Sequence, residues 1–155
     1  MKKLFIRVSL IFFYCNIVIA ESSLPKCEGT HHKKWTNCYG TMKWANGDQY
    51  TGEWEDGFKQ GQGTFIYKDG SKYVGGFRGD KLFGKGTMKY LDGGVYVGQF
   101  RYGVREGVGS MTWVHGAKYV GDWLGDKVHG AGTSTWPDGR KYTGEYEDEK
   151  RHGQG

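Results

Sequence analysis

The side chains best suited to chemistry lie near the start of the chain. Cys27, His31, His32 and Cys38 fall within one short segment, and thiolates and imidazoles are the ligands that zinc prefers in proteins. Their spacing matches no structural zinc pattern well. The third cysteine, Cys15, lies in the N-terminal leader described below, so an even pair remains and favours a disulfide between Cys27 and Cys38. A lipid anchor on Cys27 is an alternative that the preceding Lys26 disfavours.

Elsewhere the chemically capable side chains recur with the rest of the sequence. His129 and His152 precede equivalent glycines, and Lys127 and Lys150 occupy equivalent positions, so each is expected to be a solvated loop residue. An active site would need a nucleophile with its base, a carboxylate pair or a metal cluster that departs from this regularity. The sequence therefore predicts a protein that is not an enzyme and uses no cofactor.

The regularity is a repeat of 23 residues, with tyrosine and glycine columns in register. It includes Tyr50, Tyr73, Tyr96, Tyr119 and Tyr142, then Gly52, Gly75, Gly98, Gly121 and Gly144, and later Gly63, Gly86, Gly109 and Gly132. A fixed period of this length indicates a repeat architecture. One period before Tyr50 lies Cys27, so residues 27–49 are predicted to be a degenerate capping repeat, since terminal repeats lack one neighbour.

Each repeat is expected to be a β-hairpin. Tyr50, Gly52 and Trp54 alternate with polar residues, which is the pattern of a strand with one buried face, and the second half of the repeat alternates likewise from Gly61. Residues 55–60 are expected to form one connecting turn. Four Asn-Gly or Asp-Gly pairs, the first at Asn46, are expected to form type I′ turns at the other end. The predicted fold class is all-β, a single-layer antiparallel β-meander of tandem hairpins that advances about 10 Å per repeat.

The glycine columns have a predicted role in packing. A glycine has no Cβ, so it leaves a slot on the sheet in which a neighbouring aromatic ring lies, and each ring buries enough apolar area to contribute several kcal/mol. A Gly98→Val change is therefore expected to be far more harmful than the strand preference of valine suggests.

The motif YxGxW, followed seven residues later by GxG and then by a DG turn, resembles the MORN repeat, the membrane occupation and recognition nexus family. Good matches are "YTGEWEDGFKQGQGTFIYKDG" and "YVGDWLGDKVHGAGTSTWPDG". The resemblance covers 50–155 well, as four full repeats and one partial repeat, and 27–49 loosely. It implies an elongated scaffold for protein contacts, self-association or association with phospholipid membranes. A loop glycine of the motif, present as Gly57 and Gly103, is replaced by Asp80, Asp126 and Glu149, which leaves the shape of these loops open but not the strand pairing.

The N-terminal segment predicts export. Residues 1–20 have two lysines followed by a largely apolar run that ends at Ala20, which is the layout of a secretory signal peptide, and 21–26 form a short linker. An uncleaved anchor is the alternative, although Arg7 and Asn16 leave the apolar run shorter than a bilayer requires. Without this leader 19 basic residues face 17 acidic ones. The small excess gives no reason to expect nucleic acid as a partner, and the expected location is periplasmic or extracellular.

Two surfaces are candidates for binding. The first is an aromatic face for a protein partner, made of Trp54, Phe77, Phe100, Trp123, Tyr146, Tyr67, Tyr90, Trp113 and Trp136, where any ring left uncovered offers a contact strip. Stacking of a carbohydrate on these rings is a further possibility. The second is an edge of loop cations for anionic phospholipid, made of Lys59, Arg78, Lys81, Arg101, Arg105, Lys127, Lys150 and Arg151. Neighbouring acids cancel much of that charge.

The final repeat is the expected site of self-association. The sequence ends at Gly155, where the second strand of that repeat begins, which leaves the strand at Tyr142–Tyr146 with only a partial partner. Either a second copy completes it as a homodimer through 142–155, or the chain is a shortened form of a longer array.

Overall fold

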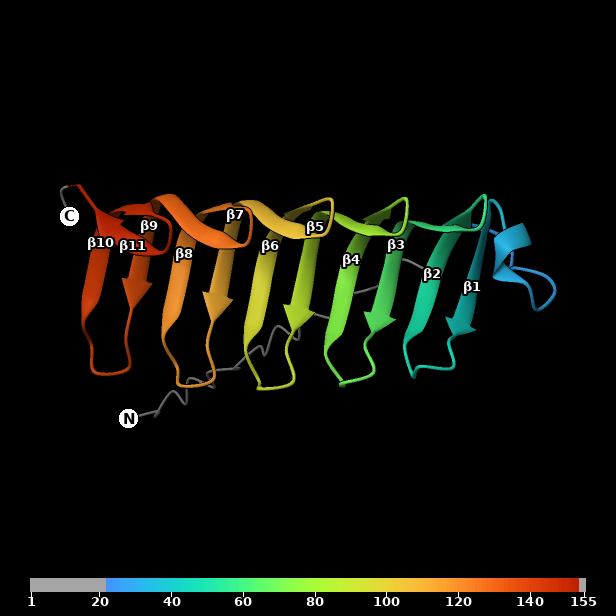
Figure 1. The fold of residues 1–155 in the computed structure, drawn as a ribbon, viewed down its shortest axis with the longest axis horizontal. Coiled ribbons are helices and arrows are strands. Elements are labelled where there is room, and N and C mark those ends of the chain that lie inside the picture. Colours follow the sequence, from blue (N-terminus) through green and yellow to red (C-terminus); the bar gives the residue numbers. More distant parts are fainter. Residues whose placement is uncertain (1–21, 154–155) are drawn as a thin grey trace, which may run out of the picture.

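The chain folds into one open sheet of eleven antiparallel strands. The computed structural model describes residues 22–153, so the predicted leader at 1–20 lies outside the described residues. A short 3-10 helix, η1 (His32–Lys34), precedes the sheet, and every strand pairs with its neighbours in the chain (Figure 1). The strands are β1 (Cys38–Lys43), β2 (Gln49–Glu55), β3 (Phe58–Ile66), β4 (Lys72–Arg78), β5 (Lys81–Lys89), β6 (Val95–Arg101), β7 (Val104–Thr112), β8 (Lys118–Leu124), β9 (Lys127–Thr135), β10 (Lys141–Glu147) and β11 (Lys150–His152). The predicted single-layer meander is confirmed.

Each long strand bends at a glycine bulge. Gly52 pairs with Gly63 while Glu53 pairs with Gln60, so β3 has two extra residues between these pairs, and Gly61 has a φ of 57°. Such bulges bend the strand that contains them, and in Figure 1 each hairpin curls over near its upper turn. The expected six-residue turn at 55–60 is wrong, because β2 ends at Glu55 and β3 begins at Phe58, so the chain reverses at Asp56–Gly57 alone.

A polar side chain on the neighbouring strand stabilises the bulge. The backbone N–H of Val108 donates to Oε1 of Gln99 at 2.8 Å, and that of Ala131 donates to Oδ2 of Asp122 at 3.1 Å. Gln99 and Asp122 occupy the same position in successive repeats, so this position supplies the acceptor that the interrupted ladder requires.

The upper turns share one conformation although their sequences differ. In Asp56–Gly57 both residues have positive φ, as type I′ turns require, and the same holds for Gly79–Asp80, Tyr102–Gly103, Gly125–Asp126 and Asp148–Glu149. The loop shape that the replaced glycines left open is therefore the same in all five turns. The backbone N–H of each turn also bonds to the preceding hairpin, as between Asp126 N and Arg105 O at 3.1 Å, and this contact offsets the cost of an aspartate in the left-handed region.

The lower turns are not type I′ as the sequence suggested. Gly70 has a φ of 92°, whereas Asp69 is absent from the positive-φ residues, and the N–H of Gly70 bonds to the carbonyl of Tyr67. This arrangement is a type I turn followed by a glycine bulge. The Asp69 carboxylate accepts the N–H of Ser71 at 2.8 Å, and this side-chain bond favours the type I geometry.

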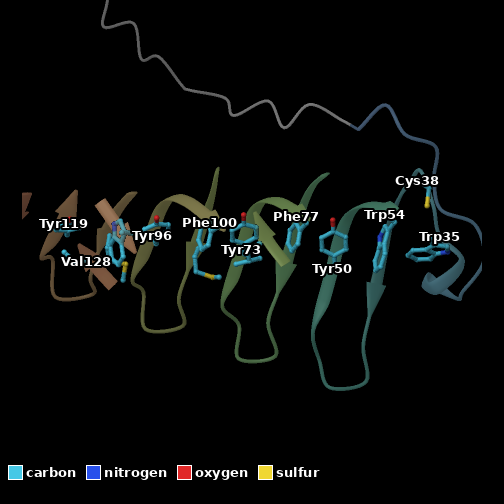
Figure 2. Close-up of a cluster of buried hydrophobic side chains, with 14 of the residues drawn as sticks. Trp35, Cys38, Tyr50, Trp54, Tyr73, Phe77, Tyr96, Phe100, Tyr119 and Val128 are labelled. Carbon is cyan, nitrogen blue, oxygen red and sulfur yellow. The ribbon is translucent and has the colours of Figure 1, made fainter. Parts of the chain in front are cut away.

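The core is a continuous line of aromatic rings along the inner face, the face of the sheet that carries the repeat tyrosines. Successive rings meet edge to face with centroids 4.8–5.5 Å apart, an arrangement that ring quadrupoles favour. Part of the line is shown in Figure 2. In chain order of contact the rings are Trp35, Trp54, Tyr50, Phe77, Tyr73, Phe100, Tyr96, Trp123, Tyr119, Tyr146 and Tyr142.

The predicted glycine slots are confirmed. Tyr50 is 0% exposed because its ring lies over the paired glycines Gly52 and Gly63, on which a Cβ would come within 2.6 Å of the ring. The phenol hydroxyl donates to the carbonyl of Glu53 at 3.0 Å. The ring therefore covers the backbone of its own repeat, and its hydroxyl is hydrogen-bonded at the bulge.

The predicted disulfide between Cys27 and Cys38 is formed and closes the N-terminal end of the array. The N–H of Cys27 bonds to the carbonyl of Tyr39 at 2.9 Å, and the N–H of Tyr39 bonds to Pro25 O at 2.8 Å, so the linker covers part of the free edge of β1. Trp35 then covers Trp54, with centroids 5.2 Å apart. The cap thus supplies the neighbour that an end repeat lacks.

Candidate interaction groove

The nine rings predicted as a binding face divide into two sets. Five belong to the core line and are only 1–7% exposed, namely Trp54, Phe77, Phe100, Trp123 and Tyr146. The other four, Tyr67, Tyr90, Trp113 and Trp136, are half-buried, and the first three pack on the edge of that core. Trp44 holds the same position in the first repeat. The accessible part of the predicted face is therefore this second row, called the groove row below.

The groove row forms one side of a groove on the inner face. The opposite side is a column of residues 23 apart, each directly across the ladder from a core ring, namely Lys59, Leu82, Arg105, Val128 and Arg151. Between the two sides lie Phe65, Met88, Met111 and Ser134, which pair with the repeat tyrosines. The bend at the glycine bulges brings the upper column over this floor.

The groove is filled in its middle and hollow near its two ends. Met88 and Met111 are 8% and 6% exposed and occupy the floor of the central repeats. At the same position Ser134 is small, and a hollow of about 490 Å³ opens there beside Trp113, Trp136 and Tyr146. The Ser134 hydroxyl lies 2.6 Å from that of Tyr146. A second hollow, of about 340 Å³, lies between Trp44, Phe65 and Lys59.

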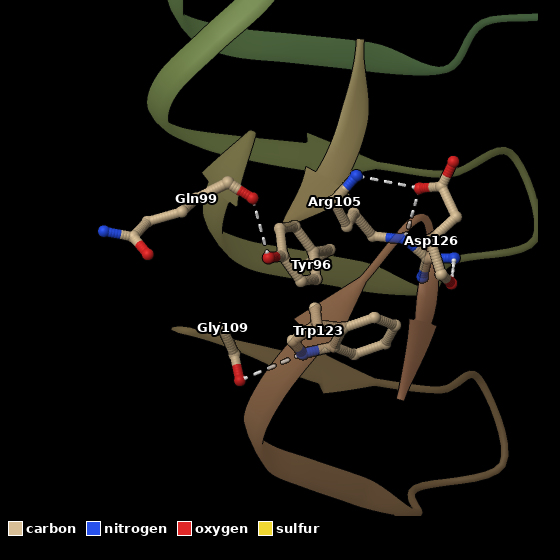
Figure 3. A network of polar contacts seen from close by, with 6 residues as sticks. All are labelled: Tyr96, Gln99, Arg105, Gly109, Trp123 and Asp126. Carbon is tan, nitrogen blue, oxygen red and sulfur yellow. Dashed lines mark hydrogen bonds and ion pairs between the residues drawn. The ribbon is translucent and has the colours of Figure 1, made fainter. Parts of the chain in front are cut away.

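Three predicted loop cations belong to the upper column and turn into the groove, and two of them, Lys59 and Arg105, also pair with an acid of the next hairpin. The Arg105 guanidinium lies 4.4 Å from the Trp123 ring centroid and bonds to Asp126 through its Nε at 3.0 Å and through Nη2 to the backbone oxygen at 2.6 Å (Figure 3). Lys59 is similar, with Nζ 2.9 Å from Asp80 and 5.2 Å from the Trp44 ring. These two cations brace adjacent hairpins.

Two further loop cations are also paired with carboxylates at the upper edge. Arg101 lies 3.0 Å from Glu106 and Lys127 lies 3.0 Å from Asp148. The pKa of the Asp148 carboxyl is lowered, first by its hydrogen bond from Lys127. Within 22–153 no ion pair is recorded for Arg78, Lys81, Lys150 or Arg151. The edge predicted to meet phospholipid is therefore already half neutralised by the protein's own acids.

Burial controls the ionisation of the groove and core tyrosines. Burial raises the pKa of Tyr67 and of Tyr90 above the usual value, and for Tyr90 the nearby Arg105 opposes that rise. The pKa of Tyr96 rises to about 12, mainly through burial. These phenols are neutral hydrogen-bonding groups at physiological pH, and none has the lowered pKa that a base or nucleophile would need.

The described part of the chain holds no group of histidine, cysteine and acidic residues placed to bind a metal. The histidines His31 and His32, considered above with the cysteines, flank the start of η1, and His32 packs against Trp54 with centroids 5.5 Å apart. Over the same residues, no helix has the length and apolar character that crossing a membrane demands.

Sequence reasoning named Lys59, Arg105 and Arg151 only as edge cations, and it missed both the upper column to which they belong and the special place of Ser134. The signal for the column is its 23-residue spacing, but its alternation of basic and aliphatic residues conceals it. The signal for Ser134 is a small polar residue where neighbouring repeats have methionine. Neither signal identifies the groove unless the bend in the strands is known, because an unbent strand would direct the upper column away from the floor.

Comparison with solved structures gives 32 matching chains, one of which is described here. A chain described as the "SAS-4 (dCPAP) TCP domain in complex with a Proline Rich Motif of Ana2 (dSTIL)" of Drosophila melanogaster aligns with a TM-score of 0.45 and 11% identity, over 68% of this chain and 58% of that one. The present chain thus spans less than two thirds of that chain. No curated protein matches.

The repeat motif itself gives the stronger result. The family model of the MORN repeat matches residues 39–49, 50–72, 73–95, 96–117, 119–139 and 142–155, so the degenerate first repeat is included through β1 and the turn after it. These six matches cover most of the chain, in register with the hairpins described above, and the chain therefore belongs to the MORN repeat family.

Proposed function

We propose that this chain is a non-enzymatic scaffold that binds a segment of a protein partner along the inner groove. MORN repeats typically form scaffolds for protein or membrane interaction. The observation that carries the proposal is the hollow over Ser134, since it is the larger of the two hollows described in the groove and is bordered by half-buried tryptophans. Concave sites with aromatic walls are where binding energy concentrates.

The rigidity of the groove supports this assignment. Its floor and both sides lie on strands of one continuous sheet, and the upper column is braced by the contacts of Lys59 with Asp80 and of Arg105 with Asp126. A preformed groove loses little conformational entropy when a ligand enters. Partner binding therefore needs no rearrangement of the array.

The chemistry of the hollow indicates which residues the partner offers. Arg151 lies with its guanidinium 5.3 Å from the Tyr142 ring and 5.9 Å from the Trp136 ring, and Lys150 lines the same hollow. Glu149 contributes one opposing charge. A segment with a large apolar side chain next to a carboxylate fits this combination, because the apolar group fills the hollow and the acid meets the cations at its rim.

A single substitution tests the proposal. Ser134→Met gives the floor the residue that Met88 and Met111 supply in neighbouring repeats, so the fold is retained while the hollow is filled. The control, Thr135→Met, adds the same side chain on the outer face of the same strand, where Thr135 is exposed. Both variants and the parent are used to select binders from a displayed library of random peptides, and affinities are measured by fluorescence titration.

The expected result is a set of peptides with an aromatic or leucine residue near an acid, bound by the parent and by Thr135→Met but at least about tenfold more weakly by Ser134→Met, because the hollow contributes a buried apolar contact. Peptides that bind all three proteins equally would exclude the groove as the binding site. The loss of the same binders in Thr135→Met would assign them to the outer face.

The finer parts of the proposal concern location and lipid. We propose export on the basis of the predicted leader at 1–20, and the Cys27–Cys38 disulfide supports it because structural disulfides belong to oxidising compartments. N-terminal sequencing of the mature protein from a secreting host tests this, with cleavage after Ala20 expected. Peripheral binding to anionic phospholipid remains the alternative to a protein partner, and co-sedimentation with vesicles over a salt series tests it.

A further inference from the structure

The outer face of the sheet, opposite the ring-bearing inner face, has a row of lysines that the groove does not use. Register places one residue from each of β1 to β10 in a single line across the strands, and this line is called the lysine row. Its members in order are Lys43, Gln49, Ile66, Lys72, Lys89, Val95, Thr112, Lys118, Thr135 and Lys141. At about 4.8 Å per strand the row is about 43 Å long.

The lysine row contains no acidic residue, and all five of its lysines are exposed. No ion pair recorded within 22–153 involves any of them. Lys72 and Lys89 face each other directly across adjacent strands, and like charges in that position destabilise a sheet. An anion bound over the pair would remove this repulsion, so the lysine row favours anion binding.

The row beside the lysine row on the same face has uncharged, short side chains. It consists of β-branched and small hydroxyl residues, namely Thr41, Thr51, Thr64, Val74, Thr87, Val97, Ser110, Val120, Thr133 and Thr143. Val97 is 52% exposed and Val120 is 44% exposed. The side chains are short, so an extended chain lying along the lysines meets no obstruction and finds hydroxyl groups at every position of the row except Val74, Val97 and Val120.

Acidic residues flank this strip on both sides. Beyond the uncharged row, the next outer positions near the bulges hold Glu53, Asp122 and Glu145, with one cation, Lys85. On the other side, the lower turns carry four aspartates and two cations, and one of the cations, Arg140, pairs with Asp138; the members are Asp48, Lys68, Asp69, Asp92, Asp138 and Arg140. A flat anionic surface laid on this face would meet these carboxylates as well as the lysines, whereas a narrow linear polyanion would meet the lysines alone.

We propose that the lysine row is a binding site for a linear anionic polysaccharide running across the strands. Charge complementarity favours a single polymer chain over a membrane, for the reason just given. The hydroxyl row favours a sugar polymer over a single-stranded nucleic acid, because nucleic-acid strands are held by aromatic platforms between the basic residues and the lysine row has none.

The experiment compares two charge-matched variants of the whole chain. The test variant carries Lys72→Gln, Lys89→Gln and Lys118→Gln. The control carries Arg78→Gln, Lys81→Gln and Lys127→Gln, which remove the same charge from the upper turns. Titrations use heparin oligosaccharides of increasing length and polygalacturonate, with poly(U) and vesicles containing phosphatidylserine as competing ligand classes. Thermal unfolding verifies that both variants fold.

The expected result is heparin binding that tightens with oligosaccharide length until the row is covered and that weakens about tenfold or more in the test variant but not in the control, with a shallower salt dependence because fewer counterions are released. Equal weakening of heparin binding in both variants would mean that the affinity depends only on net charge, and it would overturn the proposal. Binding of vesicles or of poly(U) in preference to both polysaccharides would replace it with a membrane or nucleic-acid surface. None of these outcomes depends on Ser134, so the proposed groove is tested separately.

Discussion

The ring of Tyr96 lies flat over Gly98, two residues ahead of it on β6. A Cβ on Gly98 would lie 2.6 Å from Cζ of that ring and 2.6 Å from the Cα of Gly109 on β7. Because there is no room for a methyl group, the tyrosine covers two backbones at once and its hydroxyl bonds to Gln99 O at 3.0 Å. This contact, repeated along the array, allows one layer of sheet to bury a core.

Replacing Gly98 by valine should destabilise the protein strongly. The added side chain displaces the Tyr96 ring, and the expected loss is about 3 kcal/mol or more of the free energy of unfolding. Urea denaturation measures it, and Val97→Ala at the exposed neighbouring position is the control. A loss below about 1 kcal/mol, within the range of ordinary surface substitutions, would show that the ring has another position to occupy.

Alkaline pH should lower the stability of the array, because its buried tyrosines must then lose their protons. Burial raises the pKa of Tyr96 and of Tyr119 to about 12, against about 10 in the unfolded chain. The folded state therefore holds these protons more tightly, so their contribution is complete below pH 10 and is lost as the pH rises toward 12. Urea midpoints measured from pH 8 to 12 should fall above pH 10. A flat profile up to pH 12 would contradict the burial of these phenols.

Truncating a core tryptophan should cost far more of the free energy of unfolding than truncating a groove tryptophan. Trp123 is 4% exposed and lies between Tyr96 and Tyr119 in the ring line, so Trp123→Ala should cost about 3–5 kcal/mol. Trp113 is half-buried in the groove row, and Trp113→Ala should cost less than half as much while it weakens peptide binding. Chemical denaturation gives both values, and equal costs would mean that the groove row belongs to the core.

Opening the disulfide should loosen one end of the sheet only. Cys27 and Cys38 close a loop of 11 residues in sequence separation, so their replacement by serine should cost about 2–3 kcal/mol. Since each repeat contacts only its neighbours, hydrogen exchange should quicken in β1 and β2 and stay unchanged in β6 to β9. Faster exchange throughout would indicate that the array unfolds as one cooperative unit.

The repeat tyrosines and glycines show how much of the fold can be predicted from the local sequence pattern. Alternation along Tyr50, Gly52 and Trp54 is a property of the strand alone, and the 23-residue period repeats it, so the sheet, its order and its inner face follow from the sequence. The disulfide follows from the parity of the cysteines outside the leader. Family membership follows from the same motif.

The turns show where local pattern fails. Asp80 and Asp126 stand where a glycine was expected and nevertheless adopt its conformation, because each bonds to the preceding hairpin. The lower Asp-Gly pairs form type I turns since the carboxylate caps a nearby N–H. In both cases a contact with a neighbouring group, rather than the residue type alone, selects the backbone conformation.

The sequence by itself determined the period, the strands, the pairing order and which side chains share a face, because these depend on spacing along the chain. Only the tertiary structure decided which rings are covered, which cations turn inward and where the groove is hollow. Those outcomes depend on the bend at Gly61 and its equivalents and on the side-chain volume that the next repeat brings over the floor. Ser134 becomes a candidate binding position only after the bent sheet has placed Arg151 and Trp136 around it.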